Sequence, residues 1–359
     1  MAKDNRTRVL IVDDSDLVRG ILRDVLTQDP GIVVIGEARD GREAVEQTER
    51  LRPDLITMDI QMPHMDGFAA TEQIMAYTPT PILIFSSAID KSEKHSSFNA
   101  LALGALDVMS KPDITVAGFQ ELAAQLTDKI RMLARIKVVP HIRGKMRGRG
   151  RPLPAATVAA ALKPPDNGQG AAARLVVIGA STGGPLALKK LLAPLSVQFP
   201  AGIAIVQHIS RGFIDGFVDW LTVSIRLRVR VAEDGETIRP ATVYFAPDDL
   251  QMQVSADHRI RLRADLPPWG KHRPSANHLL QSAGESYGER AVGIILTGIG
   301  DDGAAGLKVM RDRGALTIAQ DQASSLIYGM PRAAVESGAA SLVLPLDRIA
   351  DELMRVLKE

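Results

Sequence analysis

The chain has 359 residues, more than one hydrophobic core usually supports, so its length predicts two domains. Its 43 Lys and Arg residues nearly balance its 42 Asp and Glu residues, which excludes a global charge field that would select nucleic acid or a membrane. Cysteine is absent, and this excludes disulfides, thiolate nucleophiles and Cys-ligated zinc. No stretch approaches the roughly 18 apolar residues of a membrane span and no secretory segment is visible, so we expect a cytoplasmic protein.

Short apolar runs alternate with amphipathic segments up to about residue 125. The pattern predicts strands over 8–12, 33–35, 55–58, 81–85 and 105–109, and helices through 17–22 and 41–51. Strands that alternate with helices indicate a parallel sheet covered on both faces. We therefore expect a first α/β domain over residues 1–125.

Polar side chains stand where these predicted strands end. Asp13 and Asp14 follow the first strand, Asp59 follows the third, Ser86 closes the fourth and Lys111 follows the fifth. The carboxyl ends of parallel strands meet at one edge of a sheet, and three carboxylates there would suit Mg²⁺. Beside the metal, Asp59 can accept a phosphoryl group whose oxygens Lys111 and Ser86 would contact. A helix cap or a plain strand end explains any one of these residues alone, but not the whole set.

Residues 8–125 resemble a response-regulator receiver domain. The likeness rests on the segments 12–14 (Val-Asp-Asp) and 58–67, which runs from Met58 through Asp59 to Gly67. The resemblance implies a flavodoxin-like fold, phosphorylation of Asp59 by a histidine kinase, and Mg²⁺ held by Asp13, Asp14 and Asp59. Val108 stands where the family usually has an aromatic switch residue.

The composition changes between Arg131 and Arg174. Ten Lys or Arg residues fall there against one acid, Asp166, together with several prolines and glycines. Such a segment buries too little apolar surface to fold, so we predict a flexible linker over 126–172. Its basic cluster could touch DNA or anionic lipid, but the absence of an aromatic or amphipathic pattern favours a solvated tether.

The alternating pattern returns after residue 173. Strands are predicted over 175–178, 202–206, 291–296 and 315–319, and segments 243–246 and 250–254 suggest a small antiparallel insertion. We expect a doubly wound α/β domain over 173–359.

A strand-to-helix turn in this domain carries a candidate nucleophile. The segment 179–185 (Gly-Ala-Ser-Thr-Gly-Gly-Pro) satisfies the G-x-S-x-G pattern, with Ser181 at its centre. Backbone N–H groups near Thr182 and Gly183, at the start of the helix, could stabilise an oxyanion. A phosphate-binding loop is the rival interpretation, although neither the G-x-G-x-x-G spacing nor a Walker lysine is present.

A serine nucleophile needs a base and an acid. His208 ends a predicted central strand, and Asp302, with Asp301 as the alternative, follows another in a Gly-rich turn. Asp302 would orient the imidazole. The chain order Ser181, His208, Asp302 matches neither the α/β-hydrolases nor the chymotrypsin-like and subtilisin-like proteases.

Residues 175–357 resemble the CheB-type chemotaxis methylesterases. The likeness is carried by the segments 178–184, 207–208, 232–236, 272–275 (His-Arg-Pro-Ser), 297–303 and 329–331. It implies hydrolysis of glutamyl methyl esters on chemoreceptors, often with deamidation of glutamines, by Ser181, His208 and Asp302 without a cofactor. Ile209-Ser210-Arg211 and Ile299 depart from the family pattern.

The resemblance also implies partners and a mode of control. The partners would be methylated chemoreceptors and a chemotaxis histidine kinase, with no nucleic acid and with the membrane reached only through receptors. The unphosphorylated receiver would pack across the esterase site and block it. The alternative function, from the residues alone, is a non-catalytic response regulator whose second domain binds a nucleotide or small anion.

Overall fold

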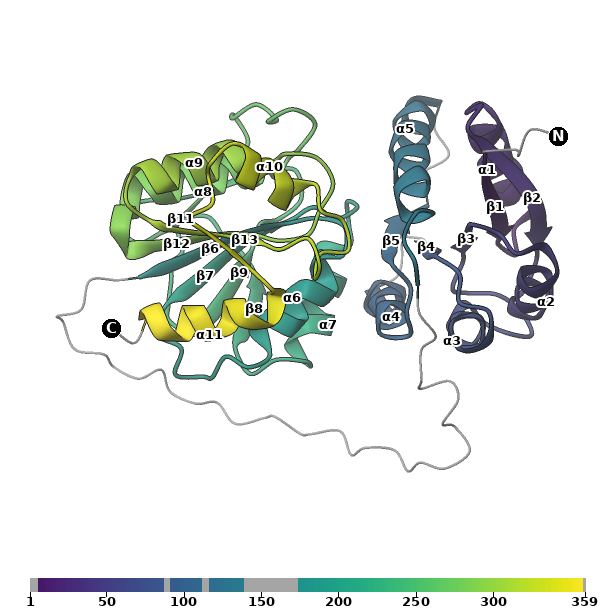
Figure 1. Cartoon of the computed structure of the whole chain (residues 1–359), viewed down its shortest axis with the longest axis horizontal. Coiled ribbons are helices and arrows are strands. Elements are labelled where there is room, and N and C mark those ends of the chain that lie inside the picture. Colours follow the sequence, from purple (N-terminus) through teal and green to yellow (C-terminus); the bar gives the residue numbers. More distant parts are fainter. Residues whose placement is uncertain (1–5, 87–90, 112–115, 139–173, 358–359) are drawn as a thin grey trace.

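A computed structural model of the chain describes residues 6–86, 91–111, 116–138 and 174–357. It contains two parallel sheets, each flanked by helices, and the two domains lie side by side (Figure 1). Most of the predicted linker, from residue 139 to 172, lies outside the described residues.

The first sheet has the strand order β2-β1-β3-β4-β5, and all of its neighbouring strands are parallel. This order is that of flavodoxin-like folds, as the sequence predicted. Its strands are β1 (Thr7–Val12), β2 (Ile32–Ala38), β3 (Leu55–Met58), β4 (Ile82–Ser86) and β5 (Asp107–Ser110). Its helices are α1 (Asp16–Thr27), α2 (Gly41–Leu51), α3 (Gly67–Tyr77), α4 (Lys91–Ala102) and α5 (Val116–Leu133).

Alternate strand residues point to opposite sides of this sheet, and the apolar residues on both sides are covered by helices. Apolar residues of α1 and α5 pack with one set, including Val9 and Ile11, while α2, α3 and α4 pack with the other. Helix α5 continues past residue 125, the predicted end of the domain, because Leu126, Ile130 and Leu133 are buried in the same core.

The second sheet has seven parallel strands in the order β14-β13-β12-β6-β7-β9-β8. The four predicted strands are present as β6 (Leu175–Ala180), β7 (Gly202–Gln207), β12 (Ala291–Ile295) and β13 (Leu316–Gln320). The sequence missed β8 (Arg228–Val231) and β14 (Leu342–Leu344). Both are short, half-exposed edge strands: β8 alternates Arg with Val, and the apolar run of β14 has only three residues.

The predicted antiparallel insertion is partly wrong. Segment 243–246 belongs largely to β9 (Thr242–Phe245), which is fully buried and pairs in parallel with β7 and β8 in the main sheet. Segment 250–254 forms β10 (Gln251–Val254), whose antiparallel partner is β11 (Ile260–Arg263). Closeness in sequence suggested a hairpin, but burial of β9 on both faces favours the interior of the sheet.

Two helical layers enclose the seven-stranded sheet. Helices α6 (Gly184–Leu192), α7 (Ile214–Thr222) and α11 (Leu346–Leu357) pack on one face. Helices α8 (Ala276–Tyr287), α9 (Ala304–Asp312) and α10 (Met330–Glu336) pack on the other. The loops that follow β6, β7 and β12 meet at the carboxyl edge, where ligands bind in such sheets.

An aromatic cluster joins the two domains. Phe98 of α4 is fully buried, and its ring centroid lies 6.4 Å from that of Phe213, 5.3 Å from that of Phe217 and 6.0 Å from that of Trp220. Aromatic pairs at these separations are favourable beyond the area that they bury. The receiver face that carries α4 therefore packs directly on α7 of the second domain (Figure 1).

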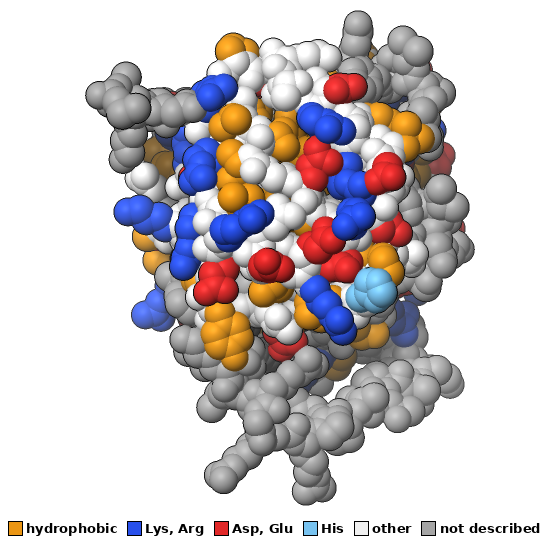
Figure 2. Space-filling view, turned by 90° about the vertical axis from the view of Figure 1, so that its right-hand side faces the viewer, with side chains coloured by type: hydrophobic (Ala, Val, Ile, Leu, Met, Phe, Trp, Pro, Cys, Tyr) orange, Lys and Arg blue, Asp and Glu red, His pale blue; other side chains and the backbone are white. Residues whose placement is uncertain are grey.

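The outer face of the receiver, on the far side from this contact, has mixed charge. Figure 2 shows Lys and Arg side chains interspersed with Asp and Glu over this face, without a large field of either sign. Ion pairs such as Arg39–Glu43 and Arg23–Glu37 lie among the exposed groups of the receiver. In the described part of the chain, no helix combines the length and the apolar character needed to cross a membrane.

Candidate active site

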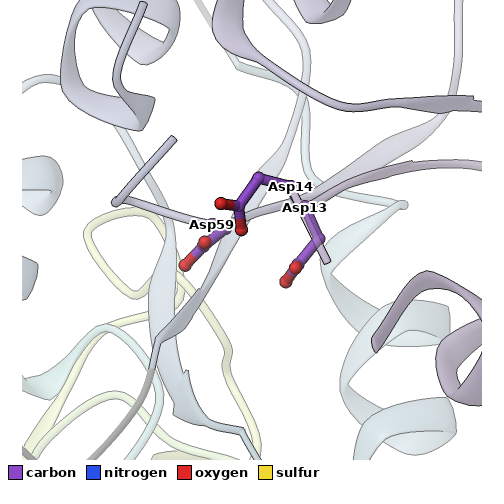
Figure 3. A group of neighbouring side chains, drawn as sticks. All are labelled: Asp13, Asp14 and Asp59. Atoms are coloured by element: carbon purple, nitrogen blue, oxygen red, sulfur yellow. The ribbon is translucent and has the colours of Figure 1, made fainter. Parts of the chain in front are cut away.

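The three predicted acids of the receiver converge at the carboxyl edge of its sheet. Asp13 and Asp14 follow β1 and Asp59 follows β3, and one carboxylate oxygen from each lies within 4.8 Å of the others. Figure 3 shows the three carboxyl groups around one shared space. Asp13 and Asp59 are buried, whereas Asp14 is exposed, so solvent reaches the cluster from one side.

Lys111 and Ser86 lie at the same edge, as predicted. The Lys111 Nζ is 2.7 Å from Asp13 Oδ2 and 3.0 Å from Asp59 Oδ2. Burial raises the pKa of Asp59 to about 6, against the opposing effect of the Lys111 ammonium. The Ser86 hydroxyl is buried and has no hydrogen-bond partner among the described residues, so it could bond an incoming oxygen atom.

The donor set suits Mg²⁺. All three groups offer hard carboxylate oxygens, and few enough of them to leave positions for water and a phosphoryl oxygen. A divalent cation would also offset the repulsion between carboxylates that, with burial, keeps the pKa of Asp59 high. The residues present therefore fit the predicted metal.

Ser181 lies in a tight turn between β6 and α6. Gly183 has φ 79°, a left-handed conformation that a glycine adopts without strain, and a Cβ there would approach Leu326 to 2.7 Å. The Ser181 carbonyl accepts hydrogen bonds from Gly184 N (2.7 Å) and from Gln207 Nε2 (2.8 Å). The turn thus holds Ser181 at the start of α6, where the free N–H groups of the first helical turn are available to an anion.

His208 and Asp302 come together although 94 positions separate them. His208 Nε2 lies 2.8 Å from Asp302 Oδ2. His208 Nδ1 is buried and has no hydrogen-bond partner among the described residues, so no bond to Ser181 exists in this conformation. The alternative acid, Asp301, is exposed and makes no such contact with His208 within the described residues.

The Asp302 carboxylate is surrounded by donors. Besides His208, Ala276 N lies 2.7 Å from Oδ2, while Ser275 Oγ (2.6 Å) and Asn277 N (3.2 Å) donate to Oδ1. Burial alone would raise the pKa of Asp302, but the hydrogen bonds from His208, Ser275 and Ala276 outweigh it and lower the pKa to about 2. Asp302 is therefore a buried anion that faces the His208 ring.

A second histidine, His272, stacks on His208, and the sequence predicted no role for it. The rings of His272 and His208 are 3.9 Å apart between centroids and nearly parallel, at 2°. Burial, together with the neighbouring His208, lowers the pKa of His272 to about 4, so this ring is neutral at pH 7. His272 and Ser275 both belong to the segment 272–275 (His-Arg-Pro-Ser), and that motif was the signal available for them.

The receiver reaches the turn that holds Ser181. Thr182 Oγ1 donates to Asp107 Oδ2 over 3.1 Å, and Lys129 Nζ lies 2.6 Å from the same oxygen. Nearby, Ser110 N donates to Ser210 Oγ over 3.2 Å. No pattern in the sequence pointed to Asp107, because its partner Thr182 is 75 positions away in another domain.

Both domains match known protein families. Residues 176–353 match the CheB methylesterase family, and residues 9–118 match the response regulator receiver domain. The chain is 45% identical over 350 residues to protein-glutamate methylesterase/protein-glutamine glutaminase 1 of Syntrophus aciditrophicus, which covers 97% of this chain and 98% of that protein. A similarly named protein of Nitrosospira multiformis is 42% identical over 352 residues, covering 98% and 97%.

A solved structure resembles the second domain. The catalytic domain of the CheB methylesterase of Thermotoga maritima matches with a TM-score of 0.50 and 34% sequence identity. The match covers 52% of this chain and 100% of that one.

Proposed function

We propose that Ser181, His208 and Asp302 form the catalytic triad of this chain, which belongs to the CheB family of methylesterases. The chain is a protein-glutamate methylesterase/protein-glutamine glutaminase regulated by a receiver domain. The observation that carries this proposal is the 2.8 Å contact between His208 Nε2 and Asp302 Oδ2 beside the Ser181 turn. The family assignment replaces the alternative hypothesis, in which the second domain is non-catalytic and binds an anion.

The geometry supports specific roles for the three residues. Asp302 holds the proton of His208 on Nε2, which leaves Nδ1 as the nitrogen that takes the proton of Ser181 Oγ. Ser181 Oγ then attacks the ester carbonyl, and N–H groups near Thr182 and Gly183 stabilise the oxyanion. His208 gives the proton to the departing methanol. Water then attacks the acyl-enzyme while His208 takes its proton, and that proton returns to Ser181 Oγ as the glutamate leaves. Losing one oxyanion donor typically costs about 3–4 kcal/mol of barrier.

Asp59 is the proposed phosphorylation site of the receiver. It follows β3, contacts Lys111, and lies at the same edge of the sheet as the Ser86 hydroxyl, which has no hydrogen-bond partner among the described residues. Asp13, Asp14 and Asp59 would hold Mg²⁺, which neutralises charge during phosphoryl transfer. We propose a chemotaxis histidine kinase as the phosphoryl source and methylated chemoreceptors as the substrates.

We propose that the unphosphorylated receiver regulates the enzyme by occlusion. Two contacts support this proposal: the aromatic cluster around Phe98, and the hydrogen bond from Thr182, next to Ser181, to Asp107. A methyl ester on a receptor must reach Ser181, and a docked receiver restricts that access. Phosphorylation of Asp59 would act by favouring a receiver state in which these contacts are lost.

The direct test of the catalytic proposal is methanol release from a methylated receptor. Wild-type protein should release methanol, and Ser181→Ala should not. Unchanged release by Ser181→Ala would show that another residue is the nucleophile.

A further inference from the structure

Four donors hold the Asp302 carboxylate, and Ser275 is the one besides His208 that uses a side chain. The other two donors, Ala276 N and Asn277 N, are backbone groups at the start of α8. Ser275 Oγ lies 2.6 Å from Asp302 Oδ1, and Ser275 is fully buried. A carboxylate with a pKa of about 2 carries no proton at neutral pH, so the hydroxyl must donate and Asp302 must accept.

The direction of the Ser275 hydroxyl is set from its other side. Ser275 is the N-cap of α8, and its oxygen accepts a hydrogen bond from Asn277 N over 3.1 Å. The oxygen thus accepts from the helix, and the hydroxyl proton is directed to Asp302 Oδ1, the acceptor 2.6 Å away. The backbone of Ser275 is held as well, since Ser275 N donates to Gln251 Oε1 over 2.8 Å.

The two carboxylate oxygens of Asp302 have different hydrogen-bond partners, and this fixes the orientation of the carboxylate toward His208. Ser275 and Asn277 donate to Oδ1, while His208 and Ala276 contact Oδ2. A carboxylate bonded at both oxygens cannot rotate about its Cβ–Cγ bond without breaking a charge-assisted hydrogen bond. Oδ2 is thereby kept facing His208 Nε2, which leaves Nδ1 as the nitrogen available to Ser181 in the proposed triad.

We propose that Ser275 is a positioning residue of the esterase, whose hydroxyl fixes Asp302 so that His208 presents the correct nitrogen to Ser181. This inference rests on the proposed triad. Ser275 acts through Asp302 and touches neither the ester nor the nucleophile. Removing its hydroxyl would cost about one hydrogen bond to a charged group, and that corresponds to a fall in kcat of roughly 10–100-fold.

The test compares full-length variants in methanol release from a methylated receptor, with acetyl phosphate and Mg²⁺ present. Ser275→Ala should lower kcat roughly 10–100-fold with little change in KM. Ser275→Thr, which keeps the hydroxyl and the cap, should recover most of the activity.

Two controls separate positioning from helix stability. Ser282, also buried on α8, donates to Leu279 O and accepts from Val254 N, so Ser282→Ala should lower thermal stability but leave kcat unchanged. Should Ser275→Ala fail to fold, Ser275→Cys preserves the shape with a weak donor and should show the same loss. A wild-type kcat in Ser275→Ala, or an equal loss of kcat in Ser282→Ala, would overturn the inference. Full activity of Ser181→Ala would instead overturn the proposed triad itself.

Discussion

The Asp107 carboxylate of the receiver accepts a hydrogen bond from the hydroxyl of Thr182, the residue that directly follows the proposed nucleophile. Both side chains are buried, and the donor–acceptor distance is 3.1 Å. The bond crosses between domains and ends one residue from Ser181. A change in the receiver can therefore affect the esterase site through this contact at the turn that holds Ser181.

Asp107→Ala should raise the basal esterase rate of the unphosphorylated full-length protein about fivefold or more. The variant loses a hydrogen bond to a charged group, and this shifts the balance toward the open state. The measurement is the initial rate of methanol release. Asp29→Ala, which breaks an ion pair with Arg131 inside the receiver, is the matched control and should leave the basal rate unchanged. A basal rate in Asp107→Ala equal to that of wild type would contradict the role of this contact.

A fragment that begins near residue 171 should have a higher basal esterase rate than the unphosphorylated full-length protein. The fragment lacks Phe98 and Asp107, so nothing from the receiver covers the Ser181 turn. Acetyl phosphate with Mg²⁺ should accelerate the full-length protein and leave the fragment unaffected. If the fragment is no faster than the unphosphorylated whole, occlusion is wrong and the receiver acts by another route.

Asp59→Asn should abolish labelling of the protein by a phosphodonor such as acetyl phosphate. An amide is not a nucleophile for phosphoryl transfer, and Asp59 is the carboxylate that contacts Lys111 at the end of β3. Asp13→Ala should instead weaken Mg²⁺ dependence and slow labelling while the label stays on Asp59. Phosphate that persists on Asp59→Asn would move the site to another residue.

Ser181→Ala and His208→Ala should each remove nearly all esterase activity, and the double variant should be scarcely worse, because triad members act as a unit. Asp302→Asn should leave more residual activity, since the nucleophile and the base remain. Asp301→Asn is the matched control, because this exposed neighbour does not contact His208 among the described residues. Loss of activity in Asp301→Asn with a silent Asp302→Asn would require reassignment of the acid.

His272 should make the catalytic domain less stable as the pH falls from 7 toward 4. Its folded pKa of about 4 lies below the ordinary 6.5, so between these values the unfolded chain binds a proton that the folded ring excludes. His272→Gln should reduce this loss of stability by on the order of 2 kcal/mol at pH 4, after allowance for solvent screening.

The measurement for His272 is urea unfolding at pH 7 and at pH 4–5, followed by the fluorescence of Trp220 and Trp269. These are the two tryptophans of the chain and both lie in the second domain. The exposed His64, in the receiver, provides the control His64→Gln, which should leave this pH dependence as in wild type. An unchanged pH dependence in His272→Gln would mean that this ring is not kept neutral by its surroundings.

Features that depend on neighbouring residues were predictable from the sequence. The strand ends that carry Asp13, Asp59 and Lys111 follow short apolar runs, and the turn at Ser181 follows from its glycines. Such signals act over a few residues, so they survive without knowledge of the fold. Strands β8, β9 and β14 were misjudged or missed because their partners, and their burial, are set by distant parts of the chain.

The residues alone predict two α/β domains that carry an acidic cluster and a Gly-flanked serine, with His208 and Asp302 as the partners of the serine. The folded arrangement was needed to show which aspartate faces His208, that Ser275 and the start of α8 hold this aspartate, and that Asp107 reaches Thr182. These contacts join residues 94, 27 and 75 positions apart. Their geometry depends on how whole helices and sheets pack, and no local pattern of residues encodes that packing.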